Sequence, residues 1–241
     1  QLKQLEMQFN ATKQRLQNKF GTQKFIVYFQ SFTNTYAPFS TLKALYEKAL
    51  SFDNVIGLSI GTRTDCVTDE ILDYLVDLSK DKEIWIEFGI QSFFDETLIN
   101  INRGDTSSNM KYWINRSKEK GLNVCGHLIY GLPNETQEMM LETFRQTVEL
   151  KVDSIKFHPL YVVKNTLLTN EFKKGRFTPI SEELYIDTVV KSIKILPENI
   201  SIQRITAGIN DSTLLSPDWC RDKHTQMKNI RLALEKEGFN Y

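Results

Sequence analysis

Six short apolar runs recur along the chain, and their spacing limits the possible fold more than any other feature. Each run has four to seven residues and is rich in Ile, Val and Phe, which is typical of buried strands and too short for an ordinary helix. The runs are 25–29, 55–60, 84–90, 124–129, 154–157 and 200–205. Their centres lie about 30 residues apart, with longer gaps before the fourth and sixth, and this is the length of one strand–helix unit.

Helical patterns fill the intervals between these runs. An apolar stripe begins at Val67, a helix over 112–120 ends at Gly121, and Asn134 with Gln137 resembles a capping box for a helix over 135–150. Further helices are predicted over 1–24, 41–50, 182–195 and 224–237. Alternating strands and helices predict a parallel sheet, and the absence of a GxGxxG motif favours a barrel over a dinucleotide-binding sheet.

We therefore predict an α/β fold, a partial (β/α)6 TIM-type barrel of parallel strands. No linker rich in Pro and Gly divides the chain, which indicates one domain. Residues 1–165 are expected to form the barrel core, and residues 166–241 a C-terminal extension of the same domain.

Charge and cysteine content exclude several classes of protein. The chain has 30 basic and 30 acidic residues, so its zero net charge does not indicate binding to nucleic acid or to an anionic membrane. No apolar run reaches the ~18 residues that a membrane span requires, and residues 1–24 contain no secretory h-region. Cys66, Cys125 and Cys220 are dispersed, which indicates reduced thiols and a cytoplasmic location. The start at Gln1, inside a helical pattern, indicates a fragment of a longer chain.

Strand alternation predicts an unusually polar interior. In the third strand Ile84 and its apolar partners face the helices, so Glu87 and Gln91 face inward. The same rule points the side chains of Arg63, Cys125, His127, Lys156 and His158 inward and places Gly57 and Gly61 where a ligand could approach the backbone. A barrel built for stability fills this space with Val, Ile and Leu. The polar rim predicts an active site; an internally satisfied polar network is the alternative.

Several motifs at the strand ends carry a resemblance to a known family. They are YFQSFTNT at 28–35, GTRTD at 61–65, EFGIQS at 87–92, INRG at 101–104, HLIYGLPNET at 127–136, KFHPL at 156–160 and LLSPDWC at 214–220. In this order they resemble the radical S-adenosylmethionine (SAM) superfamily. Within it they are most similar to the YhcC-like Fe–S oxidoreductase group of the elongator and coproporphyrinogen-oxidase branch.

The resemblance implies a set of SAM-binding positions. Gln91 and Arg103 match a glutamine and an arginine that contact SAM, and His127 stands where relatives contact the ribose. Ile129 and Gly131 match positions near the adenine. The implied cofactor-binding set is Gln30, Thr33, Thr35, Arg63, Glu87, Gln91, Ser92, Arg103, His127, Ile129, Gly131 and His158. The catalytic residues stay unassigned, and no metal-ligating residue is predicted. Gln30-Ser31-Phe32 replaces the family's usual glycine triplet.

The resemblance also implies two cofactors, SAM and a [4Fe–4S] cluster. The family's CxxxCxxC loop has no counterpart in this sequence, so the first core strand and the cluster ligands are expected upstream. The complete enzyme is expected to cleave SAM reductively to a 5′-deoxyadenosyl radical, with a flavodoxin or ferredoxin as electron donor and an unidentified substrate. The present chain is expected to be inactive, with no membrane partner and no indicated nucleic acid.

Two alternatives stay open from the residues themselves. Lys156 beside His158 is compatible with an aldolase-like barrel enzyme that forms a Schiff base with a carbonyl substrate. A non-catalytic domain that binds SAM or a partner protein is the other. The sequence indicates neither the oligomeric state nor the role of the C-terminal extension.

Overall fold

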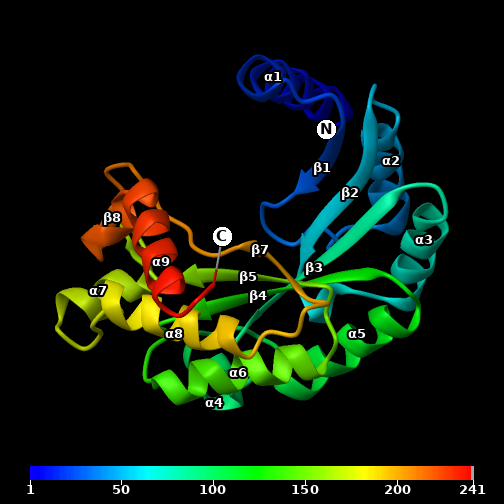
Figure 1. Ribbon diagram of the computed structural model, residues 1–241. Helices are drawn as coiled ribbons and strands as arrows, with labels where there is room; N and C mark the ends of the chain where they lie inside the picture. The colour runs from blue at the N-terminus through cyan, green and yellow to red at the C-terminus, as the bar shows by residue number, and fades with distance from the viewer. Residues whose placement is uncertain (240–241) are drawn as a thin grey trace. The chain divides into compact units, whose positions relative to one another are not determined.

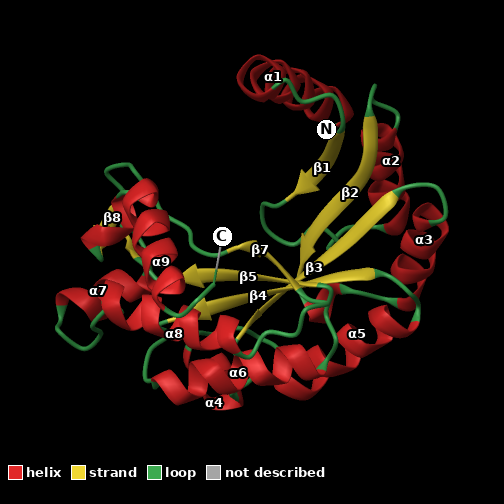
Figure 2. Cartoon of the chain, in the orientation of Figure 1, coloured by secondary structure: helices red, strands yellow, loops and turns green. Residues whose placement is uncertain are grey.

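In the computed structural model, which describes residues 1–239, strands and helices alternate along the chain (Figures 1 and 2). One sheet has six strands in the order β1-β2-β3-β4-β5-β7, and the pairs β1–β2, β2–β3 and β5–β7 are parallel. Its strands are β1 Phe25–Phe29, β2 Val55–Thr62, β3 Glu83–Gln91, β4 Asn123–Tyr130, β5 Ser154–Pro159 and β7 Ser201–Arg204. All six predicted strands are confirmed, and with them the α/β class.

The helices lie in the intervals between the strands. They are α1 Leu2–Phe20, α2 Phe39–Leu50, α3 Asp69–Ser79, α4 Asp95–Asn100, α5 Ser107–Glu119, α6 Gln137–Glu149, α7 Leu167–Lys173, α8 Glu182–Lys194 and α9 Lys223–Lys236. Two 3-10 turns, η1 Thr64–Cys66 and η2 Asp218–Arg221, follow β2 and β8 Leu214–Ser216. The predicted capping box at Asn134 is wrong. The Thr136 hydroxyl caps α6 by accepting from the Met139 amide at 3.3 Å, and Asn134 has φ +66° in the preceding turn.

Chain contacts divide the described residues into two compact units. The first contains 1–89 and 109–125, and the second contains 90–108 and the chain from 126 onward. β3 and β4 each begin in the first unit and end in the second. The predicted boundary at residue 165 stays a prediction.

In the first unit, apolar residues of β2 and β3 form the core beneath α2 and α3 (Figure 1). Leu58, Ile60, Ile84 and Ile86 are at most 1% exposed, as strand alternation predicts. Ile56 differs, because it is 37% exposed. Phe25 pairs with Val55 and Ile26 with Gly57, so Ile56 is the extra residue of a β-bulge, and the alternation restarts after it.

The glycines of β2 are explained by close strand packing. A Cβ on Gly57 would lie 2.0 Å from the Glu83 carbonyl oxygen, and one on Gly61 would lie 3.2 Å from the Phe29 carbonyl oxygen. Neighbouring backbone therefore occupies the space that the sequence assigns to a ligand. At Gly57 this contact alone excludes any side chain.

In the second unit, α6 and α8 pack against each other and α8 packs against α9 (Figure 1). Tyr130, Phe144, Phe157 and Tyr185 form an aromatic core with ring centroids 5.3–6.2 Å apart. β6 Val162–Val163 and β8 form a small antiparallel sheet. The C-terminal extension thus contributes β8 to a strand pair that the sequence does not predict. Among residues 1–239, no helix combines the length and apolarity needed to cross a lipid bilayer.

Candidate functional site

Glu87 on β3 is a buried carboxylate held by hydroxyl groups from two neighbouring strands. Its side chain is 2% exposed, and its two oxygens accept hydrogen bonds from Tyr28 at 2.9 Å and from Ser59. Tyr28 pairs with Ser59 across β1 and β2, so three adjacent strands contribute one polar side chain each. This contact places Ser59 on the same face as Glu87, which is the face that the sequence assigns to the interior.

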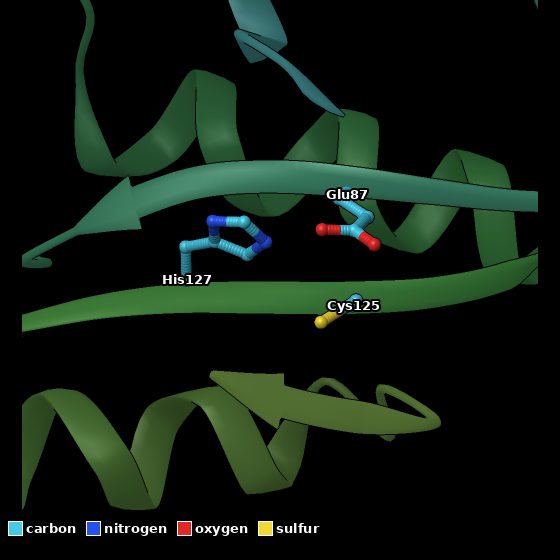
Figure 3. Close-up of side chains that lie close together, drawn as sticks. All are labelled: Glu87, Cys125 and His127. Atoms are coloured by element: carbon cyan, nitrogen blue, oxygen red, sulfur yellow. The ribbon is translucent and has the colours of Figure 1, made fainter. Parts of the chain in front are cut away.

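The next strand, β4, adds a thiol and an imidazole near this carboxylate (Figure 3). Cys125 is fully buried, and His127 is half-buried two residues further along the strand. One potential ligand atom from each of Glu87, Cys125 and His127 lies within 4.8 Å of the others. Carboxylate, thiolate and imidazole are ligand types of transition metals, and they also bind polar groups of organic ligands. The sequence predicts no metal set here. The available signal was the Cys-x-His spacing on one face of β4.

The loop after β1 is tied to the end of β2. Thr35 is 3% exposed, and its hydroxyl lies 2.5 Å from the Thr62 hydroxyl and donates to the Cys66 carbonyl at 2.6 Å. The Asn34 side-chain amide donates to the Gly61 carbonyl at 2.9 Å. Thr35 is a predicted SAM contact, but in this structure its hydroxyl holds the loop against the end of β2. The other two predicted residues of this loop are exposed Gln30 and half-buried Thr33.

Arg63, which follows β2, forms a bidentate ion pair with a near neighbour. Its Nε and Nη2 atoms lie 2.8 and 2.6 Å from the two carboxylate oxygens of Asp65. The pair orients the guanidinium at the end of the strand, which is the predicted rim. A surface pair of this kind contributes little to stability.

Gln91 ends β3 in a backbone conformation that non-glycine residues rarely adopt. Its φ of +68° lies in the left-handed region, which costs about 1–2 kcal/mol for a residue with a Cβ. The Ser92 amide donates to the Ile90 carbonyl at 2.9 Å, which closes a tight turn around Gln91. The side-chain Oε1 atom of Gln91 is buried and has no hydrogen-bond partner among residues 1–239. Strain together with an unsatisfied buried acceptor is characteristic of a ligand-binding position.

The residue after Gln91 is fixed by a buried carboxyl group on another loop. Ser92 is fully buried, and its hydroxyl donates to Glu135 and accepts from the Phe94 amide at 3.1 Å. Burial raises the pKa of Glu135, while hydrogen bonds from Ser92 and Thr97 act in the opposite direction. Glu135 thus holds the turn that presents Gln91. Sequence reasoning missed this residue, although it stands in the GLPNET motif.

Among the remaining predicted positions, Gly131 is explained by its local packing. Gly131 has φ +90°, and a Cβ there would lie 2.7 Å from the Cβ of Ile180, so only glycine fits. Ile129 is half-buried on β4. Arg103 is half-buried after α4, where its backbone amide donates to the Leu98 carbonyl at 2.9 Å.

His158 on β5 has a neutral imidazole, and its hydrogen bond shows which ring nitrogen carries the proton. Its Nδ1 lies 2.7 Å from the Pro159 carbonyl oxygen, and because a carbonyl only accepts, Nδ1 carries the proton and Nε2 is an acceptor. Burial lowers the pKa of His158 to about 4, and electrostatic interactions with Arg204 and His127 act in the same direction. The structure thereby brings together two predicted site residues, His127 and His158.

Arg204, the last residue of β7, adjoins His158 and is absent from the predicted set. Its Nε donates to the Phe157 carbonyl at 3.4 Å, and it pairs in register with Lys156, which is 8% exposed. The available signal was an arginine next to the end of the last predicted strand, 200–205. Lys156 and Arg204 place two positive charges on neighbouring strands beside a neutral histidine.

Comparisons with known proteins identify both halves of the sequence. The model of the radical SAM superfamily matches residues 6–147, and that of the Radical_SAM C-terminal domain matches residues 152–236. YtqA, an uncharacterized protein of Bacillus subtilis, is 35% identical over 231 residues, which cover 96% of this chain and 72% of that protein. Protein YhcC of Escherichia coli is 38% identical over 217 residues, covering 89% of this chain and 70% of YhcC.

A solved structure confirms the fold class. The Elp3 protein of the archaeon Methanocaldococcus infernus, with its N-terminus deleted, superposes on 98% of this chain with a TM-score of 0.83 at 21% identity. This chain spans 60% of the length of that protein chain. The likeness supports the prediction of a partial barrel of parallel strands.

Proposed function

Because this chain belongs to the radical SAM superfamily, whose members use SAM and a [4Fe–4S] cluster, we propose that it is the SAM-binding core of an enzyme that cleaves SAM reductively. Bound together, these cofactors supply radical chemistry at unactivated C–H bonds. The protein's contribution is to bind SAM, orient it and exclude side reactions. The electron donor we propose is a flavodoxin or ferredoxin, as the resemblance implies.

Gln91 is the observation that carries this proposal. A buried amide oxygen without a partner costs about 1–3 kcal/mol, and a strained backbone adds to that cost. A ligand that donates a hydrogen bond to Oε1 removes the first cost. The ribose hydroxyls and the amino group of SAM are such donors, so the residue fits the cofactor that the family uses.

We assign the other SAM contacts in the second unit by the chemistry of their side chains. The guanidinium of Arg103 suits the carboxylate of the methionyl group. The imidazole of His127 suits a ribose hydroxyl, and half-buried Ile129 offers an apolar surface for the adenine. In the first unit, the turn containing Thr33 is assigned to the amino group.

The cysteines of this chain do not fit the cluster. Cys66 lies in η1, Cys125 on β4 and Cys220 in η2, at positions 59 and 95 residues apart, so no loop offers three thiolates. Cys220 is fully buried, and burial raises its pKa to about 12, which opposes thiolate formation. We therefore propose that residues outside this sequence supply the cluster ligands and that the 241 residues bind SAM without cleaving it.

Anaerobic reconstitution tests whether cleavage of SAM needs cluster ligands from outside the 241 residues. The 241-residue chain, incubated with iron, sulfide, dithionite and SAM, is expected to release no 5′-deoxyadenosine. A longer natural form that carries a CxxxCxxC loop is expected to release it under the same conditions. A longer form that holds a cluster but leaves SAM intact would overturn the proposed reaction.

A further inference from the structure

A cavity opens between the first two strand–helix connections of the first unit. Its volume is about 530 Å³, and it is lined by residues of the segments 35–39 and 65–71, which run from β1 into α2 and from β2 into α3. Both segments follow the carboxyl ends of parallel strands, which is the end where barrels of this class have their ligand sites. A cavity of this size holds a small organic molecule.

The lining of the cavity is apolar and aromatic. Val67 and Ile71 are 4% and 5% exposed, and half-buried Phe39 is fixed by an edge-on contact with the Tyr74 ring, with 5.4 Å between the ring centroids. Tyr36, in contrast, is 81% exposed. Covering an exposed aromatic ring is favourable because it removes apolar surface from water. The lining therefore favours a ligand with an apolar body.

The charge of the lining is negative. Of the lining residues, all within 1–239, two carry a carboxylate and none is basic. The Asp65 carboxylate is offset by its bidentate ion pair with Arg63. Glu70 is exposed and has no ion pair or hydrogen bond among the described residues. The Glu70 carboxylate thus gives the cavity a negative charge that no described residue neutralises by direct contact.

These features together select a cation. An ammonium group is attracted both by a carboxylate and by the face of a tyrosine ring. A ligand carboxylate or phosphate would be repelled by Glu70, with no basic lining residue to offset the repulsion. Glu70 also lies in the first turn of α3, where a negative charge stabilises the helix. That role accounts for the carboxylate but for neither the apolar lining nor exposed Tyr36.

We propose that this cavity is a binding site for a small organic cation, an amine with an aromatic or alkyl body, whose ammonium group pairs with Glu70 and whose body contacts Val67, Ile71 and Tyr36. The site goes beyond the proposed function, because it requires neither the cluster nor cleavage of SAM. Thr35 is the one lining residue that belongs to the predicted SAM-binding set, and its hydroxyl is bonded within the protein.

Ligand-detected NMR titration of the 241-residue chain tests the site with two matched probes. Near pH 7, 2-phenylethylamine is a cation and 3-phenylpropionate an anion, and each carries its charged group on a phenyl ring through a two-carbon chain. We expect saturable binding of the amine, at least about fivefold tighter than binding of the carboxylate at constant ionic strength.

Substitutions of the two exposed lining residues separate the effects of charge and ring. Glu70→Gln should weaken binding of the amine at least about threefold without weakening that of the carboxylate. Tyr36→Ala should weaken both probes at least about threefold, whereas Tyr36→Phe keeps the ring and should bind the amine like the wild type. Circular dichroism establishes that each variant is folded.

The matched control is Glu183→Gln, which should bind both probes like the wild type. Glu183 is also an exposed glutamate in the first turn of a helix, α8, and it does not line the cavity.

Four results would overturn the site: no saturable binding of the amine, equal affinity for the two probes, an affinity for the amine that neither Glu70→Gln nor Tyr36→Ala reduces, or displacement of the amine by S-adenosylhomocysteine. The last result would mean that the cavity belongs to the cofactor site. Binding of S-adenosylhomocysteine alone is a separate test. If it fails while the amine still binds through Glu70, the proposed function falls and the cation site stands.

Discussion

Two single residues, Gln91 and His158, show how this protein keeps hydrogen-bond acceptors available for a ligand. Gln91 combines a left-handed backbone with a buried amide oxygen that lacks a partner. His158 is held neutral by burial and carries its proton on Nδ1. The state of Gln91 costs free energy in the folded protein, whereas a neutral imidazole is the ordinary state of histidine near pH 7. Each residue leaves a hydrogen-bond acceptor available for a ligand.

Gln91→Gly should therefore leave the free energy of unfolding unchanged or raise it by about 1 kcal/mol. Glycine adopts φ +68° without strain, and the substitution removes the unsatisfied amide, which offsets the lost packing. Asn54→Gly is the matched control for a change to glycine at a left-handed position. Asn54 has φ +64°, and asparagine already tolerates this backbone region. Urea unfolding measures both. A decrease of more than about 1 kcal/mol in Gln91→Gly would show that the side chain has a structural role.

His158 should make the protein less stable as the pH falls. The pKa of His158 is about 4 in the folded protein, whereas an ordinary histidine, as in the unfolded chain, has a pKa of 6.5. The unfolded chain therefore binds more protons than the folded protein between pH 4 and pH 6.5. The stabilisation is complete above pH 6.5 and is lost progressively down to about pH 4, a change of about 2–3 kcal/mol.

The corresponding measurement is urea unfolding near pH 7 and near pH 4. His158→Gln should lose about 2–3 kcal/mol less than the wild type across this interval. Exposed His224 on α9 provides the control variant His224→Gln, which should follow the wild type. Identical pH profiles for His158→Gln and the wild type would contradict the assigned state of His158.

At the scale of elements, periodicity predicts the six strands of the main sheet, and in β2, β3 and β5 the apolar positions are buried, as at Leu58, Ile84 and Phe157. It misses α4, α7, β6 and β8, which are too short to show a period. It also misplaces Ile56, since a bulge depends on the register with β1 and not on β2 alone.

The candidate site is predictable to a similar extent. Glu87, His127 and His158 follow from strand alternation, and Gln91 from its motif. Glu135 and Arg204 require the fold, because their importance comes from contacts with Ser92 and with the Phe157 carbonyl in distant parts of the sequence. The sequence also cannot show that Gly57 and Gly61 face a neighbouring strand and not a ligand.

Gly57→Ala tests this packing of β2 against β3. The new Cβ would lie 2.0 Å from a backbone carbonyl, which cannot move without separating the strands, so we expect a loss of about 3 kcal/mol or more in the free energy of unfolding. Gly121→Ala should cost only about 1 kcal/mol, because its φ of +83° is strained but nothing lies within 4 Å. Equal losses for the two variants, measured by urea unfolding, would contradict the register.

At the scale of the whole molecule, the family match and the cysteine content must be considered together. The two family models follow each other over 6–147 and 152–236, so nearly the whole chain belongs to this class of protein. Its three cysteines nonetheless lie far apart in the sequence. We therefore propose that SAM binding and SAM cleavage are separable in this protein, and that these residues supply the binding.

Calorimetric titration of S-adenosylhomocysteine, an unreactive analogue of SAM, into the 241-residue chain tests that assignment most directly. We predict saturable binding to one site, weakened at least tenfold in Gln91→Ala and unchanged in Gln203→Ala, whose side chain is exposed on β7. Absence of binding to the wild-type chain, or equal binding by Gln91→Ala, would contradict the account.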